Sequence, residues 1–453
     1  MSVKVCDAIC GAGKTQSCIT MINNSGNKKF MFVTPYLDEV ERIKRSCAEK
    51  NFVSPEQTGA NHFSKLNDIV RLIREGKNIA TTHALFSNYT DSVKELIQKQ
   101  KYILILDEEI NLFQPVAIDG GDVDFLVRNN IAKVENEKVS WVDKHYKGVV
   151  FNDIVRLAQS RNMVDYDGSF YFWTLPMDVF NCFTDVYILT YMFEYQPIGH
   201  YFIANQIKYE LIGTTKENGA YRFCSMPEMD RKLDLRDKIH ICDNPSFNRV
   251  GDAAFSLSAG WYDRAAEDPD NEELQELKAD IRKFLRKTKN GNTDKMWTCL
   301  NRHRSLLSGK GYSAGFLTYN KRATNDFANK HYLAFCLNVY MMPWIQNYLS
   351  RIGATKVSQG MYALSVLIQW LFRSAIRKGE EVWLYLPSKR MRLLLKGWLN
   401  NLAEGNDLLE VTYKNEVAKI QKESRAIQGL QETLHQMCLQ HKKDKRRKNN
   451  EKV

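Results

Sequence analysis

The stretch AICGAGKT, residues 8–15, decides the fold expected for this 453-residue chain. It follows a short β-branched run, Val3–Val5, and opens a segment with helical spacing, Lys14–Asn23. Glycines let a backbone curl so that successive N–H groups face one point, and the N-terminus of a following helix adds partial positive charge there. The order strand, glycine-rich turn, helix therefore predicts a phosphate-binding loop. The alternative is a tight strand–helix turn in which Lys14 and Thr15 are incidental.

In a phosphate-binding loop each residue type has a chemical role. The backbone of Gly11, Ala12 and Gly13 would surround the phosphates of ATP, and the ammonium group of Lys14 would reach the β- and γ-phosphates. The hydroxyl of Thr15 would be a ligand of Mg²⁺. The first glycine of the usual pattern is replaced here by Ala8.

A second motif follows the apolar run Ile103–Leu106, which ends in Asp107-Glu108-Glu109. A carboxylate at the carboxyl end of a buried parallel strand lies at the sheet edge where ligands bind. Asp107 could hold Mg²⁺ through water, and Glu108 could orient and deprotonate the attacking water. The alternative is that these acidic residues only end the strand and begin a helix.

Strand-like and helix-like segments alternate along the chain, which indicates α/β layers with parallel sheets. In the first half, strands are expected at Val3–Val5, Lys29–Thr34, Asn78–Thr82, Tyr102–Leu106 and Val186–Thr190, and helices at Lys14–Asn23, Leu37–Lys50 and Asp91–Gln100. In the second half, strands are expected at Lys238–Cys242, Ser313–Tyr319, Phe335–Val339 and Glu381–Leu386, and helices at Glu272–Lys287, Pro343–Arg351 and Tyr362–Arg377.

Two segments interrupt this alternation. Residues 114–175 contain Gly120-Gly121 and an aromatic cluster at 171–173, and we interpret them as an inserted subdomain or an extended loop. Residues 401–441 carry apolar side chains at three- and four-residue steps, which predicts an amphipathic helix. That helix would lead into the basic tail, residues 442–453.

Composition and charge narrow the class of protein. The formal net charge is +11, of which the tail contributes five, and such a basic surplus favours a polyanionic partner, nucleic acid first. The longest nearly apolar stretch, Tyr362–Phe372, is far shorter than the roughly 18–20 residues that span a bilayer. Ten cysteines are dispersed without a CxxC pair, which fits a reducing cytoplasm rather than a disulfide or zinc scaffold.

With both motifs in view, the chain resembles superfamily 2 helicases, in particular the small helicase-like ATPases carried by bacteriophages. The loop at 8–15 has that superfamily's A-x-x-G-x-G-K-T form, and Asp107-Glu108 matches the start of its acidic box, whereas Glu109-Ile110 departs from it. The resemblance covers roughly residues 1–400. It implies two RecA-like domains in tandem that bind ATP and Mg²⁺ in the cleft between them.

The same resemblance extends to a motif in the second half. Gln369, Arg373 and Arg377 resemble the superfamily's arginine-finger motif, and their four-residue spacing would place them on one face of a helix. Guanidinium groups on an otherwise apolar helix need anions opposite them, and the phosphates of ATP would supply these. The alternative is a helix that pairs with nearby carboxylates.

Further segments resemble the superfamily's nucleic-acid-contacting and coupling motifs. They supply the candidate nucleic-acid contacts Thr34, Pro35, Thr82, His83, Thr190 and Thr324. Hydroxyl groups and backbone amides at such positions would bind phosphates without reading the sequence. The cluster Tyr171-Phe172-Trp173 could stack on bases, although such clusters more often form core.

The sequence therefore predicts an ATP-dependent nucleic-acid helicase or translocase of the α/β class. Three domains are expected. Residues 1–200 and 201–400 would each be RecA-like, the first with the insertion and the second with the helix that carries the arginine motif. Residues 401–453 would form the amphipathic helix and the basic tail. Expected partners are nucleic acid, DNA before RNA, and replication or recombination proteins, in the host cytoplasm if a phage encodes the chain. Two alternatives are open: a duplex-DNA translocase of packaging or remodelling type, and a nucleotide-switched binding module with little unwinding.

Overall fold

The computed structural model describes residues 1–56, 65–108, 110–118, 120–143, 162–226, 233–268, 270–288, 291–320, 326–354 and 357–404. The described chain forms two compact units. The first comprises Met1–Asp230 and, from much later in the sequence, Met341–Val357, and the second comprises the rest of the described chain. Both are built on parallel sheets, as the alternating pattern predicts.

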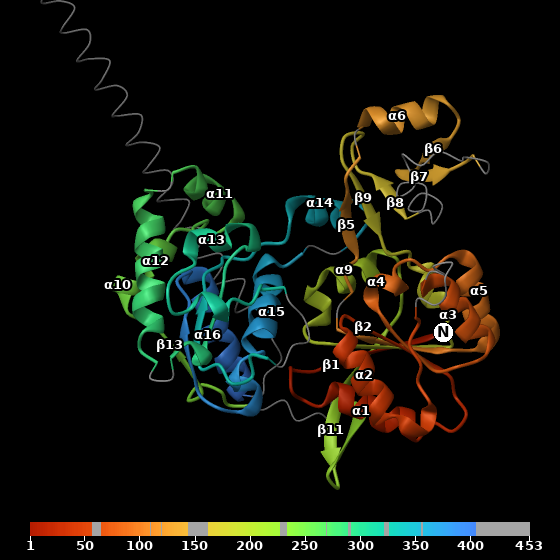
Figure 1. The fold of residues 1–453 in the computed structure, drawn as a ribbon, viewed down its shortest axis with the longest axis horizontal. Helices are drawn as coiled ribbons and strands as arrows, with labels where there is room; N and C mark the ends of the chain where they lie inside the picture. The colour runs from red at the N-terminus through yellow and green to blue at the C-terminus, as the bar shows by residue number, and fades with distance from the viewer. Residues whose placement is uncertain are drawn as a thin grey trace, which may run out of the picture. The chain divides into compact units, whose positions relative to one another are not determined.

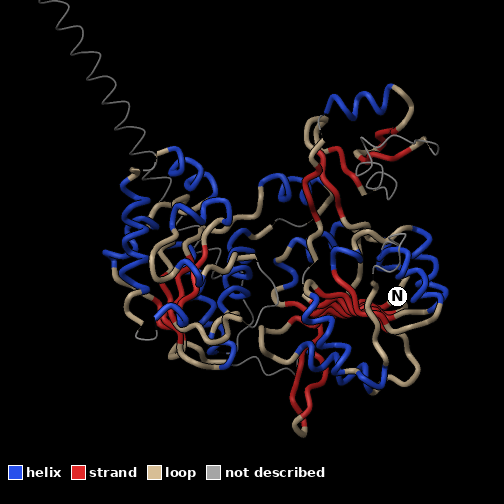
Figure 2. Tube along the Cα trace, in the orientation of Figure 1, coloured by secondary structure: helices blue, strands red, loops and turns tan. Residues whose placement is uncertain are grey.

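The first unit is organised around a central sheet, whose strands are red in Figure 2. The sheet has seven strands in the order β12-β11-β1-β10-β4-β2-β3. Its strands are β1 (Ser2–Asp7), β2 (Phe30–Thr34), β3 (Ile79–Thr82), β4 (Ile103–Asp107), β10 (Asp185–Thr190), β11 (Glu210–Glu217) and β12 (Ala220–Ser225). All neighbours pair in parallel except β11 and β12, which form an antiparallel hairpin at one edge. All five strands expected in the first half of the chain are confirmed.

Helices cover both faces of this sheet (Figure 1). They are α1 (Lys14–Asn23), α2 (Leu37–Ser46), η1 (Ala48–Lys50), α3 (Lys65–Arg74), α4 (His83–Phe86), α5 (Asp91–Gln100), α8 (Asp178–Asn181), η2 (Phe193–Tyr195) and α9 (Pro197–Ala204). Apolar side chains of α1 and α2 form one core cluster with alternate residues of β2 and β4. The bounds of α1 and α5 are those predicted, whereas the helix expected over Leu37–Lys50 is divided at Cys47.

The described residues of the insertion form a five-stranded antiparallel sheet, ordered β5-β9-β8-β7-β6, and the helix α6. Its elements are β5 (Phe113–Val116), α6 (Gly120–Arg128), β6 (Ala132–Glu135), β7 (Lys138–Trp141), β8 (Met163–Asp165) and β9 (Tyr171–Thr174). The paired strands β5 and β9 connect this sheet to the rest of the first unit (Figure 1). The cluster 171–173 lies in β9 and is buried, so it forms core and not a base-stacking surface.

A helix from the second half of the sequence, α14 (Pro343–Arg351), completes the first unit. The ring centroid of Tyr348 lies 4.8 Å from that of Phe172 in β9 and 5.8 Å from that of Phe113 in β5. Phe113 also packs at 5.5 Å against Tyr201 of α9. At the end of α14, the Arg351 guanidinium lies 4.5 Å above the Tyr166 ring. This aromatic cluster joins the insertion, α9 and α14 in one core.

The second unit contains a four-stranded parallel sheet, ordered β13-β16-β15-β14. Its strands are β13 (Ile239–Ile241), β14 (Lys295–Thr298), β15 (Tyr332–Phe335) and β16 (Val382–Tyr385). Its helices are α10 (Pro245–Asn248), η4 (Arg249–Gly251), α11 (Ala259–Glu267), α12 (Glu272–Leu285), η5 (Gly291–Asp294), η6 (Asn301–His303), α13 (Arg304–Leu307), η7 (Ser313–Gly315), α15 (Gln359–Leu371), η8 (Ala375–Lys378) and α16 (Lys389–Glu404).

Two strands of the second sheet differ from the prediction. The strand expected at Phe335–Val339 lies earlier in the chain, because β15 covers Tyr332–Phe335 and shares only Phe335 with that segment. The segment expected as a strand, Ser313–Tyr319, begins with a 3₁₀ turn, and only Phe316 bridges to Trp297. The fourth strand is instead β14, which the sequence pattern did not reveal. A Cβ atom at Gly315 would come within 2.3 Å of the Lys295 carbonyl oxygen. The backbone of this segment therefore packs closely against the backbone of β14.

The expected helix over Tyr362–Arg377 is also wrong at its end, because α15 stops at Leu371. The Ser374 hydroxyl donates to the Leu371 carbonyl oxygen at 2.7 Å, and Ser374 itself is extended. A serine that bonds to a nearby carbonyl competes with helix continuation. Gln369, Arg373 and Arg377 therefore do not share one helical face: Arg373 follows the helix, and Arg377 lies in η8.

The unit boundaries differ from the expected division at residue 200. Strand β11 pairs in parallel with β1, so the β11–β12 hairpin belongs to the first sheet and this unit continues to Asp230. Helix α16 ends at Glu404, and the predicted amphipathic helix and basic tail lie outside the described residues. Among the helices that the structure describes, none combines the length and the apolar character needed to cross a membrane.

The aromatic contacts of α14 lead to a stability prediction for the insertion. We expect Tyr348→Ala to lower the opening free energy of the β9 amides by about 2–4 kcal/mol, because it leaves a cavity beside Phe172 and Phe113. Native-state hydrogen exchange measures this quantity. The neighbouring exposed residue provides the control, and Asn347→Ala should change protection by less than about 0.5 kcal/mol. Equal effects of the two substitutions would contradict the packing role of α14.

Candidate nucleotide-binding site

The predicted phosphate-binding loop connects β1 to α1 and is curled by two glycines. Gly11 and Gly13 adopt φ values of 91° and 85°, in the left-handed region that side chains disfavour. Inside the curl, the Ala12 N–H donates to the Ile9 carbonyl oxygen at 3.1 Å, and α1 begins directly at Lys14. The first turn of α1 therefore follows the loop without a spacer, which is the arrangement that concentrates N–H groups on a phosphate.

The sheet order places this loop at a topological switch point. β1 and β10 are neighbours in the sheet. After β1 the chain passes through α1 to β2, which lies on the β10 side of β1. After β10 it passes through α9 to β11, which lies on the opposite side of β1. Connections that leave neighbouring strands in opposite directions open a crevice at the carboxyl ends of those strands. The loop at 8–13 lies at that end of β1.

Backbone hydrogen bonds bring three predicted segments together at this edge. The Ala8 N–H donates to the Thr190 carbonyl oxygen at 3.2 Å, and the Glu108 N–H donates to the Leu189 carbonyl oxygen at 3.0 Å. The ends of β1, β10 and β4 are thus linked side by side. The loop and the acidic motif, which are about ninety residues apart in the sequence, are neighbours in the fold.

The ammonium group of Lys14 lies inside the loop. Its Nζ atom donates to the carbonyl oxygens of Ala8, at 2.6 Å, and Ile9, at 3.2 Å. Both acceptors are neutral, so these bonds leave the positive charge uncompensated by an anion. A phosphate placed in the loop would provide that compensation.

Thr15 and Asp107 meet across the crevice, as expected for a shared Mg²⁺ site. The Thr15 Oγ1 atom lies 3.4 Å from Oδ1 of Asp107, and His83 Nε2 lies 3.0 Å from the Asp107 carbonyl oxygen. Thr15 comes from the first turn of α1, Asp107 from the end of β4, and His83 from the start of α4. A hydroxyl and a carboxylate are hard oxygen ligands, the type that Mg²⁺ prefers.

The electrostatics of Asp107 support a cation at this point. Burial, together with the nearby Glu108 and Glu39 carboxylates, raises the pKa of Asp107 from 3.8 to about 8, and Lys14 and Arg42 only partly oppose this shift. A buried carboxyl group with this pKa is largely neutral at pH 7, and a bound dication would restore its charge. The residues present thus fit Mg²⁺.

Glu108 follows in an unusual backbone conformation. Its φ of 65° is left-handed although it is not a glycine, and such strain is retained mainly where the surrounding structure requires it. The left-handed turn at Glu108 follows directly on β4 and directs the chain away from the strand. Its neighbour Glu109 lies outside the described residues.

Sequence reasoning missed Asp7, the last residue of β1. Its two carboxylate oxygens accept the N–H groups of Met192 at 2.7 Å and Phe193 at 3.0 Å, which fixes the turn after β10 beside the loop. Burial raises the pKa of Asp7 despite these bonds. An aspartate at the end of an apolar strand and directly before the loop was the available signal.

The candidate nucleic-acid contacts differ in how far their side chains are exposed. Thr34 and Thr190 are buried, with 0% and 2% of their surface exposed, so neither side chain is available to a nucleic acid here. The Thr190 hydroxyl instead donates to Gln196 Oε1 at 3.0 Å. Pro35, Thr82 and His83 are half-buried at the ends of β2 and β3, and Thr324 lies outside the described residues.

The residues of the predicted arginine motif belong to the second unit. Gln369 is half-buried in the last part of α15, Arg373 is 5% exposed, and Arg377 is exposed. The Ala375 N–H donates to the carbonyl oxygen of Lys330, two residues before β15 begins, so this turn lies at the amino end of that strand. Their role at the phosphates stays a prediction.

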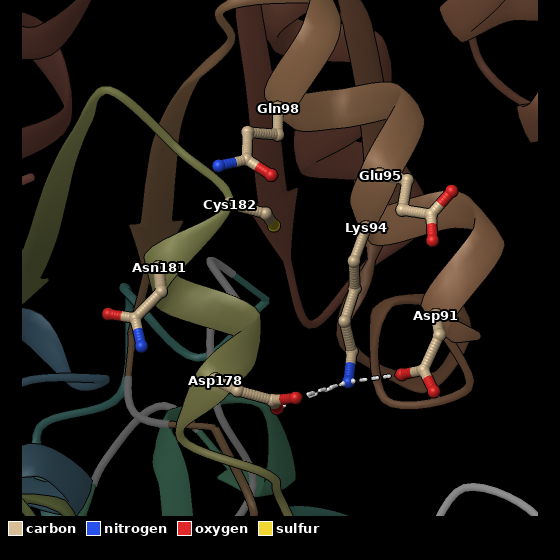
Figure 3. A pocket seen from close by; sticks show the side chains of 7 residues that line it. All are labelled: Asp91, Lys94, Glu95, Gln98, Asp178, Asn181 and Cys182. Atoms are coloured by element: carbon tan, nitrogen blue, oxygen red, sulfur yellow. Dashed lines mark hydrogen bonds and ion pairs between the residues drawn. The ribbon is translucent and has the colours of Figure 1, made fainter.

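A surface hollow lies elsewhere on the first unit, lined by Asp91, Lys94, Glu95, Gln98, Asp178, Asn181 and Cys182 of α5 and α8 (Figure 3). The Lys94 ammonium binds the carboxylates of both Asp91, at 3.1 Å, and Asp178, at 2.9 Å. The pair with Asp91 lies within α5, and the pair with Asp178 joins α5 to α8. The hollow includes none of the predicted site residues.

Comparison with known proteins identifies the family. The chain is 37% identical over 417 residues to the "SPbeta prophage-derived uncharacterized protein YonV" of Bacillus subtilis (strain 168), covering 88% of this chain and 99% of that protein. The chain belongs to the YonV family. Two models of this family match it: the YonV middle domain at residues 113–173 and the YonV C-terminal Rossmann-like domain at residues 233–399.

The two YonV models agree with the observed architecture. The middle domain runs from β5 into β9, which is the inserted sheet, and the C-terminal Rossmann-like domain contains the parallel sheet of the second unit. Among solved structures, that of S. tokodaii Xpd4 aligns over 88% of this chain and 94% of its own, with a TM-score of 0.41 and 12% identity.

The raised pKa of Asp107 predicts how the substitution Asp107→Asn changes the stability of the protein at different pH values. Between pH 4 and 8 the folded protein keeps a proton on Asp107 that the unfolded chain releases, so stability from this group falls as the pH rises through that range. Without Mg²⁺ at pH 7, we expect Asp107→Asn to stabilise the protein by roughly 1–3 kcal/mol, an advantage that disappears near pH 4.

Thermal or chemical unfolding at several pH values measures the difference. Asp124→Asn is the control, because Asp124 is exposed and its ion pair with Arg128 spans 3.9 Å. A destabilised Asp107→Asn variant at pH 7 would show that Asp107 is charged in the folded protein.

Proposed function

We propose that this YonV-family protein hydrolyses Mg²⁺-ATP at the edge of the first sheet and uses the energy to move along nucleic acid, as a helicase or translocase. The observation that carries the proposal is the meeting of the Lys14 loop and Asp107 at one switch point, with Thr15 Oγ1 3.4 Å from Asp107 Oδ1. A cation, a hydroxyl, a carboxyl group and a helix N-terminus converge there, and these are the groups that triphosphate hydrolysis requires.

Each residue has a role in the proposed reaction. The Lys14 ammonium exchanges its bonds to Ala8 and Ile9 for bonds to the β- and γ-phosphates, where it offsets the charge that develops during transfer. Thr15 and Asp107 would hold Mg²⁺, which would supply electrostatic stabilisation of the phosphate oxygens. Glu108 accepts the proton of the attacking water, and its position beside the buried Asp107 keeps that water near the metal ligands.

Asp107 also predicts how the reaction depends on pH. The carboxyl group must lose its proton to hold the cation, and its pKa of about 8 means that protons compete with Mg²⁺ at neutral pH. The apparent affinity for Mg²⁺-ATP is therefore expected to weaken as the pH falls below about 8.

We propose that the protein moves along nucleic acid. The support is the net charge of +11, with a concentrated basic tail at 442–453, since lysine and arginine bind phosphates without sequence preference. Gln369, Arg373 and Arg377 are proposed to contribute guanidinium and amide groups to the reaction.

One experiment tests both halves of the proposal. ATPase activity is measured alone and with single-stranded DNA, duplex DNA and RNA, each across a series of salt concentrations. We expect stimulation by single-stranded DNA that declines as salt rises. Absence of any ATPase activity would overturn the enzymatic assignment. Slow activity that no nucleic acid stimulates would favour a nucleotide-switched binding module, and stimulation by duplex alone would favour a duplex translocase.

Glu108→Gln separates binding from turnover. The amide retains the size of the side chain but cannot accept a proton, so ATP affinity should change little while kcat falls by roughly 10²–10⁴-fold. Titration with ATP and steady-state hydrolysis in the presence of nucleic acid measure the two quantities. Glu95→Gln, at an exposed position of α5, is the control. Hydrolysis by Glu108→Gln at the normal rate would remove Glu108 from the role of base.

A further inference from the structure

The β11–β12 hairpin packs directly on the phosphate-binding loop, although no predicted motif includes it. The Thr214 hydroxyl of β11 donates to the Ala12 carbonyl oxygen at 2.7 Å. Thr214 is buried, with 6% of its surface exposed. The hydroxyl therefore binds a backbone atom of the loop itself, in a position where water cannot easily replace it.

Tyr221 of β12 covers the next residue of the loop. A Cβ atom added to Gly13 would lie 2.2 Å from Cδ1 of the Tyr221 ring and 2.5 and 2.7 Å from its two bonded ring neighbours. Such similar distances mean that the ring presents its face to Gly13. The Lys216 ammonium lies 5.4 Å from the centroid of the same ring, and the hairpin runs beside α1 (Figure 1).

The two contacts fall on the part of the loop with the greatest conformational freedom. Gly13 has φ 85° and Gly11 has φ 91°, and glycines lose more backbone entropy on ordering than other residues. A loop that is held in its binding conformation before the ligand arrives binds with less loss of entropy. Contacts from a neighbouring strand at Ala12 and Gly13 provide this kind of restraint.

We propose that Thr214 and Tyr221 are positioning residues that hold the phosphate-binding loop in its nucleotide-binding conformation. The hairpin thereby links nucleotide binding to the segment through which the chain first leaves the first unit, because β12 ends at Ser225 and the N-terminal part of this unit ends at Asp230. The inference rests on the proposed function of the loop, and it adds that nucleotide affinity depends on a hairpin outside all the recognised motifs.

The first test measures binding of a non-hydrolysable ATP analogue with Mg²⁺, and steady-state kinetics. Tyr221→Ala should weaken analogue binding by about tenfold and raise KM with kcat changed less than about twofold, whereas Tyr221→Phe keeps the ring and should bind normally. Thr214→Val removes only the hydroxyl and should weaken binding severalfold. Its matched control is Thr215→Val, on the opposite face of the same strand.

The second test does not depend on nucleotide. Hydrogen exchange of the loop amides, residues 11–15, should be faster in nucleotide-free Tyr221→Ala and Thr214→Val than in the wild type or Thr215→Val. Gly13→Ala should destabilise the wild type more than it destabilises Tyr221→Ala, because the ring that its methyl group meets is then absent.

The outcomes separate this inference from the proposed function. If wild-type protein binds no ATP analogue, the proposed function fails, and the exchange measurements still decide whether the hairpin restrains the loop. If wild-type protein binds and Tyr221→Ala binds equally well with unchanged loop exchange, the positioning role is overturned. Tighter binding by Tyr221→Ala would also overturn it, since the ring would then obstruct the site.

Discussion

The fold of the first unit depends on one backbone constraint: between β1 and α1 the chain must turn sharply within a short loop. Gly11 and Gly13 meet this requirement with left-handed φ values, and α1 starts immediately afterwards at Lys14. Hydrogen bonds from Ala8 and Glu108 to the end of β10 then align the loop with the acidic motif. A glycine-based turn at a switch point thus places the loop at the edge where we propose that the unit binds a phosphorylated ligand.

Lys14 and Asp107, two ionisable groups at this edge, make no ion pair with each other that the structure of the described residues shows. The Lys14 ammonium is bound by neutral carbonyl oxygens, whereas burial and neighbouring carboxylates keep the pKa of Asp107 near 8. A buried carboxyl group with a raised pKa lowers the stability of the nucleotide-free protein at neutral pH. Mg²⁺-ATP would compensate both groups at once, with the phosphates at Lys14 and the cation at Asp107. Under the proposed function, Lys14 and Asp107 therefore serve the ligand, and the strand–helix turn that carries Lys14 is not incidental.

The sequence predicted what local patterns determine and missed what distant contacts determine. Strands β1, β2, β3, β4 and β10 and helices α1 and α5 follow from apolar runs and helical spacing, and the loop follows from its glycines. Strand β14 and the pairing of β11 with β1 did not, because their neighbours are distant in sequence. The bounds of α14 were predicted, yet its place in the first unit depends on aromatic rings of the insertion. Asp7 and Tyr221 act through backbone atoms of other segments, which no spacing rule reveals.

Affinity for nucleotide in wild type and in Lys14→Ala tests the central claim most directly. Titration with Mg²⁺ and ATP, ADP or AMP should show that wild-type protein binds ATP and ADP but scarcely binds AMP. Lys14→Ala should weaken ATP binding by about 100-fold, since it removes a charge-assisted bond to the β- and γ-phosphates, while Lys28→Ala, at an exposed position, should leave it unchanged. Equal ATP affinities of the wild type and Lys14→Ala would contradict a phosphate-binding role for residues 8–15.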